Sequence, residues 1–187
     1  MTMIYVITRI LTFPGAFFRN LWELLVCRLC SIAVHDTPAF RYSEFCGHAE
    51  HERLDENPWK SFFTCWFPFT MNFVLSLYFL SGSAYQLLYI GDTQNIVSYL
   101  FLWLGVSFAA NCAPSFEDML SFKDSVYGGK SILLKIIFAP FFAVFCVMAC
   151  LERYSLTFLL AVAYGVLFPY IFGWLLPALS LFQNLIS

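Results

Sequence analysis

Three polar residues, Arg19, Asn20 and Glu23, interrupt an apolar stretch that runs from Ile10 to Val26. Arg19 and Glu23 are spaced i, i+4, so a helix places both side chains on one face, where they can form an ion pair. Ionisable groups within a membrane-embedded helix are costly, and they usually face a partner, a cavity or a reaction site. We therefore expect any function of the chain to involve this cluster.

A second group of residues with metal-binding or proton-binding side chains surrounds the polar segment 31–60. It comprises Cys27, Cys30, His35, Cys46, His48 and His51. Cys27 and Cys30 form a C-x-x-C, and with the histidines they would suit a structural zinc site. The spacing is irregular, which favours a packed Cys27 and solvated histidines. A pH-sensing patch is the other alternative, since His titrates near neutrality.

The composition indicates a membrane protein. Hydrophobic residues make up 60% of the chain and charged residues 12%, against roughly 25% charged in a soluble domain. Charge-free runs cover Ser61–Gly91, Thr93–Phe116, Ile136–Leu151 and Tyr154–Ser187. A helix needs about 20 apolar residues to cross the bilayer core, and the run at 136–151 reaches this length if Lys135 extends to the interface.

With Met3–Leu29 added, these runs predict an all-α, polytopic membrane protein with five transmembrane helices, in one transmembrane domain over 1–187. The last run contains Pro169 and Pro177, which break or kink a helix, so it is expected to be one kinked span or two half-spans. The segment 31–60 is expected to be a surface loop. Alternating residues between Ala39 and Phe45 predict a short hairpin within it.

The distribution of basic residues predicts the orientation. One side would hold Arg28, Arg41, Arg53, Lys60, Lys123, Lys130 and Lys135, and the other Arg9 and Arg153. By the positive-inside rule the longer loops are then cytoplasmic and the N-terminus lies outside, in the plasma membrane or an organellar inner membrane. The net charge of −2 gives no reason to expect a nucleic-acid partner.

Two further patterns concern packing. Small residues such as Ser76, Ala84 and Gly105 predict that the second and third spans pack closely on each other. The aromatic residues that begin the second span predict a lipid-facing belt at the membrane interface; they are Phe62, Phe63, Trp66, Phe67 and Phe69.

Four fragments, in order along the chain, resemble the compact membrane zinc metallopeptidases of the site-2 protease clan. They are the helix at 13–29, Val34-His35-Asp36, the segment from Phe40-Arg41-Tyr42 to Gly47 and His48, and 104–118 with Pro114, Ser115 and Asp118. In that family the helix carries His-Glu-x-x-His. The corresponding positions here are Arg19, Asn20 and Glu23, and Asn111 stands where the family has another His.

The resemblance implies a vestigial metal site at Arg19, Asn20, Glu23, Asn111 and Asp118, with no cofactor favoured. Guanidinium offers a metal no lone pair, and Asn20 cannot act as the general base that activates a zinc-bound water. Arg19, neutralised by Glu23 and Asp118, would then occupy the place of the metal ion.

These observations lead to the hypothesis of a catalytically inactive metallopeptidase homologue that binds, scaffolds or regulates a membrane protein or a transmembrane peptide. One alternative is an active zinc peptidase with unusual ligands such as Glu23, Cys112, Asp118 or a loop His. The other is a small transporter or channel subunit, in which the buried charges would line a path.

Overall fold

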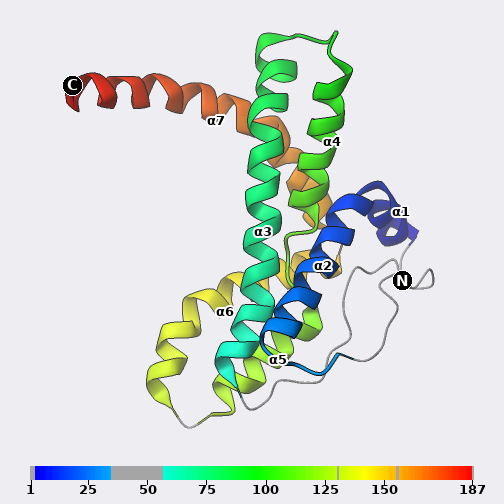
Figure 1. The fold of residues 1–187 in the computed structure, drawn as a ribbon, viewed down its shortest axis with the longest axis vertical. Helices are drawn as coiled ribbons and strands as arrows, with labels where there is room; N and C mark the ends of the chain where they lie inside the picture. Colours follow the sequence, from blue (N-terminus) through cyan, green and yellow to red (C-terminus); the bar gives the residue numbers. More distant parts are fainter. Residues whose placement is uncertain (1–2, 35–56, 130, 155, 187) are drawn as a thin grey trace.

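The computed structural model describes residues 3–34, 57–129, 131–154 and 156–186 (Figure 1). All regular elements in these ranges are helices. They are α1 (Met3–Leu11), α2 (Phe13–Leu29), α3 (Pro58–Ala84), the π-helix η1 (Tyr85–Ile90), α4 (Ile96–Ala110), α5 (Phe116–Tyr127), α6 (Ile132–Arg153) and α7 (Leu156–Ile186). The predicted hairpin at 39–45 and the residues His35, Cys46, His48 and His51 lie outside the described ranges.

The centre of the molecule is one continuous helical rod made of α3 and η1 (Figure 1). Asn57 caps its start by accepting hydrogen bonds from the amides of Trp59 and Lys60, groups that have no partner within the helix. Gly91 ends it with a φ of 78°, a left-handed conformation that glycine adopts without a steric penalty. The rod has 33 residues, which correspond to about 50 Å at 1.5 Å per residue.

Within the described residues, two helices are long and apolar enough to cross a membrane, namely Pro58–Ile90 and Ile132–Glu152. They correspond to the second and fourth expected spans. The predicted all-helical class is confirmed. The length and composition of these two helices support association with a membrane.

Two of the other expected spans are interrupted. Met3–Leu29 is divided at Thr12, whose backbone leaves the helical region at φ −107° and ψ 27°, so the expected single helix is wrong. The third expected span is helical only over Ile96–Ala110, and the 15 residues of α4 extend about 22 Å, less than a bilayer core of about 30 Å. Pro114, which has no backbone N–H, lies in the break that follows.

The last apolar run forms a single helix, because α7 continues through both prolines from Leu156 to Ile186. It is thus one helix, as in the first of the two expected alternatives. In Figure 1, α7 rises behind α3 and then turns away from the other helices toward the C-terminus.

The expected packing of α3 on α4 is confirmed, since these two helices make the most extensive contact in the described structure. Ser76 and Ala84 of α3 are completely buried. A Cβ atom added at Gly105 of α4 would lie 2.6 Å from Leu80 Cγ, so the interface has no room for a larger residue at this point.

The predicted aromatic belt is wrong in part, because Phe62 lies in the core formed where α3 meets α5 and α6. Its ring packs 5.1 Å from that of Phe138 and 6.0 Å from that of Phe122, measured between ring centroids. Trp66 is packed against the same cluster. Of the aromatic side chains between Trp59 and Phe69, only Trp59 and Phe63 are exposed. The helices α5 and α6 cover the other side of α3.

Candidate functional site

Arg19 is the largest of the completely buried side chains, with 1% of its surface exposed. Its Nε donates to Glu23 Oε1 at 3.0 Å, within α2. Its Nη1 donates to Glu152 Oε1 at 2.7 Å, from α2 to α6. The predicted pair of Arg19 and Glu23 is confirmed, and the guanidinium also binds a carboxylate from a distant part of the chain.

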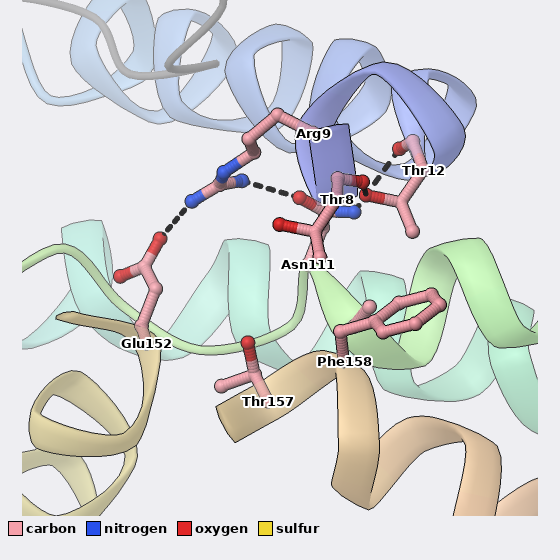
Figure 2. Close-up of a pocket in the computed structure, with 8 residues that line it drawn as sticks. Thr8, Arg9, Thr12, Asn111, Glu152, Thr157 and Phe158 are labelled. Atoms are coloured by element: carbon pink, nitrogen blue, oxygen red, sulfur yellow. Dashed lines mark hydrogen bonds and ion pairs between the residues drawn. The ribbon is translucent and has the colours of Figure 1, made fainter. Parts of the chain in front are cut away.

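Glu152 joins two cations. In addition to Arg19, its carboxylate pairs with Arg9 of α1, so one acidic side chain at the end of α6 ties together α1, α2 and α6. Figure 2 shows Arg9 extending from α1, with its guanidinium between Glu152 and Asn111. Arg9 donates to the Oδ1 atom of Asn111, which links α1 to the end of α4 as well.

Asn111, which follows α4, forms hydrogen bonds with the break between α1 and α2 at Thr12. Its Nδ2 donates to the carbonyl oxygens of Thr12 at 3.1 Å and Ser107 at 2.9 Å. Its own carbonyl accepts a hydrogen bond of 2.8 Å from Asn72 Nδ2, and Asn72 Nδ2 also donates to the carbonyl of Gly15 at 3.2 Å. Backbone groups left unpaired at the ends of helices α1 and α4 are satisfied in this way.

The close approach of α2 to α4 depends on Gly15. A Cβ atom at this position would overlap the carbonyl oxygen of Ser107. Because that space is free, the Gly15 amide donates to Ser107 Oγ at 2.8 Å, and Ser107 Oγ donates to the carbonyl of Thr12 at 2.9 Å.

Asp118 lies in the first turn of α5 and is 2% exposed. Its backbone amide donates to Ser115 Oγ at 3.0 Å, and Ser115 Oγ donates to Asp118 Oδ2 at 2.7 Å. Neutralisation of Arg19 by Asp118 remains a prediction, while the second direct ion pair of Arg19 is formed by Glu152.

The remaining predicted site residues are less closely involved. Asn20 is half-buried, and its Oδ1 has no hydrogen-bond partner in the described part of the chain. Cys27 is completely buried in α2, and Cys30 follows at the end of that helix. Burial of Cys27 agrees with the packing alternative, whereas the proposed loop metal or pH-sensing group remains a prediction because His35, Cys46, His48 and His51 fall outside the described ranges.

No group of three or more His, Cys, Asp and Glu side chains suited to a metal ion occurs within the described ranges. Glu23 is engaged by Arg19 at 3.0 Å. A metal ion at Glu23 would compete with this cation for the negative charge of the carboxylate.

A small polar cleft lies beside Arg9, between the start of α7 and the end of α4. It is lined by Thr8, Arg9, Thr12, Ala110, Asn111, Glu152, Thr157 and Phe158. Figure 2 shows Thr157 and Phe158 on the side opposite Arg9. The space that water can occupy in this cleft is about 10 Å³, which is room for roughly one water molecule.

Sequence reasoning missed Arg9, Glu152 and Asn72. The distribution of basic residues places Arg9 on the outer side of the membrane and says nothing of Glu152. A signal was present, because Glu152 is the only acidic residue after Asp124 and stands between two long charge-free runs. An isolated carboxylate in such a context is expected to have a partner.

Comparisons with protein-family models, with curated proteins and with solved structures found no match to this chain. The chemistry of the site therefore has to be inferred from its own residues. The guanidinium groups of Arg9 and Arg19 and the carboxylates of Glu23 and Glu152 form an ion network that fixes helices relative to one another. A guanidinium is neither a metal ligand nor a base.

Proposed function

We propose that the chain is an integral membrane protein that acts as a non-hydrolytic binding or scaffold subunit, derived from a metallopeptidase architecture. The observation that carries this proposal is the buried Arg19 guanidinium, ion-paired with Glu23 at 3.0 Å and Glu152 at 2.7 Å. Arg19 stands at the position that corresponds to the first His of the His-Glu-x-x-His motif in the family that the chain resembles. A cation held there by two acids takes the role of the metal ion in joining the helices.

The proposed loss of hydrolysis follows from the same residues. Peptide hydrolysis on zinc needs ligands with free lone pairs and a base that takes a proton from the bound water. Arg19 has no lone pair to offer, and the amide of Asn20 does not accept a proton at neutral pH. Glu23 is the one residue of the three that retains ligand chemistry, and it is bound to Arg19.

The binding role is supported by the outer surface. Helix α4 exposes large apolar side chains, including Ile96 at 82% and Trp103 at 44%, and α7 separates from the other helices (Figure 1). Exposed apolar surface of this extent marks contact with lipid or with another protein. The proposed partners are the bilayer and a membrane protein or transmembrane peptide packed along these helices.

Metal analysis tests the proposal. The full-length protein, purified in detergent with and without added zinc, is expected to hold far less than one equivalent of zinc. About one equivalent that disappears in Glu23→Ala or Asp118→Ala would overturn the proposal in favour of a peptidase with unusual ligands, since loss of ligands abolishes such binding. Native electrophoresis of mildly solubilised membranes is expected to show a complex with a second protein, and a monomer alone would contradict the scaffold role.

A further inference from the structure

An apolar cavity of about 170 Å³ lies among α3, α4, α6 and α7. Phe69 and Phe73 form one wall, Met148 a second, and Leu160 with Ala161 a third. Apolar cavities of roughly 150 Å³ remain dry and hold molecules such as benzene, so this space suits about six carbon atoms of hydrocarbon.

One end of the cavity is polar. Thr157 lines both this cavity and the small cleft that contains Arg9, Asn111 and Glu152. Figure 2 shows the Thr157 side chain near the base of that cleft, below Glu152. Because the cleft has room for about one water molecule, at most one oxygen atom of a head group can enter it, from a hydroxyl or from one side of a carboxyl at Thr157.

We propose that the cavity binds the hydrocarbon chain of a single-chain amphiphile, of the fatty acid or fatty alcohol class, with its small head group at Thr157. The proposal rests on the membrane location in the proposed function, because such amphiphiles are concentrated in bilayers. The part of the chain that the cavity does not cover extends out of its mouth into the surrounding lipid.

The surroundings of the cavity favour this occupant over the side chain of a partner helix. Val144 and Val147 of α6 are 51% and 59% exposed, and Leu160 of α7 is 50% exposed, so aliphatic surface leads from the lining to the outside. An amphiphile would use both the apolar walls and the polar end. An inserted apolar side chain would contact the apolar walls alone.

A photoactivatable C16 fatty acid, and the matching fatty alcohol, test the proposal on the full-length protein in detergent micelles. Irradiation is expected to label peptides that contain Met148 and Leu160, and an excess of unlabelled fatty acid or alcohol should abolish the labelling. Preference for the acid or the alcohol identifies the head group.

Two alanines of α7 provide a matched pair of variants. Ala161 is 3% exposed and lines the cavity, whereas Ala163 is exposed on the same helix. Ala161→Phe would fill the space and is expected to reduce the saturable labelling by about tenfold or more, the effect of losing one well-buried apolar contact. Ala163→Phe is expected to leave it unchanged.

The melting temperature of Ala161→Phe shows whether that variant folds, and Thr157→Val provides a second, nearly isosteric probe. If Ala161→Phe does not fold, a several-fold loss of labelling in Thr157→Val still supports the proposal. Labelling that is not saturable, or that is equal in the Ala161 and Ala163 variants, overturns it. Retention of the protein in membranes during alkaline extraction is independent of this result, so failure of the cavity proposal and failure of the membrane location are distinguishable.

Discussion

Arg19 is stable as a buried cation because carboxylates reach it from two directions. Glu23 is one helical turn away, so the pair could be predicted from the i, i+4 spacing alone. Glu152 is 133 residues away along the chain, and the resemblance pointed to Asp118 instead. No local pattern indicates which distant acid approaches a buried cation, because this depends on the packing of α6 against α2. The pair of Arg19 and Glu23 was therefore predictable, whereas for Glu152 the sequence could indicate that it has a partner but not that the partners are Arg19 and Arg9.

Removal of the Glu152 carboxylate is expected to destabilise the protein strongly. Glu152→Gln would leave Arg19 and Arg9 without their shared anion, and breaking a buried ion pair from one side costs about 3–5 kcal/mol. Asp92→Asn is the control, because Asp92 is exposed and such a change is within about 0.5 kcal/mol. Thermal unfolding in detergent measures both, and equal melting temperatures would mean that water or lipid headgroups solvate the two guanidinium groups.

The order of stability among combined variants tests whether Arg19 needs its acids. Glu23→Gln with Asp118→Asn removes two of the negative charges around the cation, whereas adding Arg19→Met also removes the cation and leaves Arg9 paired with Glu152. Replacement of a buried ion network by apolar groups is often neutral or stabilising. We therefore expect the triple variant to melt closer to wild type than the double variant. A double variant that melts like the wild type would refute this explanation.

At the scale of elements, the helix breaks gather around the polar network. The break at Thr12 is stabilised by Asn111 Nδ2 and Ser107 Oγ, which both donate to its carbonyl, and Trp103 Nε1 donates to the carbonyl of Leu11 at 2.8 Å. These bonds come from α4 and the residue that follows it. Charge-free runs predicted longer spans because hydropathy does not register such long-range bonds, which allow a helix to end inside an apolar segment.

Two glycines in helices provide a test of how closely these elements must approach. Gly15→Ala would place a methyl group against the Ser107 carbonyl and push α2 away from α4, so a large fall in melting temperature is expected. Gly82→Ala adds a Cβ with no atom within 4 Å, and such a replacement in a helix stabilises by about 0.5–1 kcal/mol. If Gly15→Ala is as stable as Gly82→Ala, the close contact of α2 with α4 is not required.

For the whole molecule, composition was enough to predict a helical protein with long apolar spans, and the second and fourth expected spans correspond to the long apolar helices Pro58–Ile90 and Ile132–Glu152. The arrangement of shorter pieces was not predictable, since the break between α1 and α2 at Thr12 is held by hydrogen bonds from Ser107 of α4 and from Asn111, which follows α4. The orientation in a bilayer remains a prediction from the basic residues. The prediction assigns the two ends of the molecule to opposite sides of the membrane. One end is the loop at 91–95 and the other is the loop between α5 and α6, and the two lie far apart in Figure 1.

Cysteine accessibility tests this orientation. Thr93 lies in the loop at 91–95, and Ser131 lies directly before α6. Both residues are exposed. In a variant with Cys30 and Cys46 replaced by serine, Thr93→Cys is expected to react with a membrane-impermeant maleimide added to intact cells or vesicles. Ser131→Cys, a nearly isosteric change on the side that holds Lys123 and Lys135, should react only after permeabilisation, because the basic side is expected to be cytoplasmic. Labelling of both positions before permeabilisation would place them on the same side and exclude a single membrane crossing between them, along α4 and α5. The reverse order would show that the basic residues do not determine the orientation.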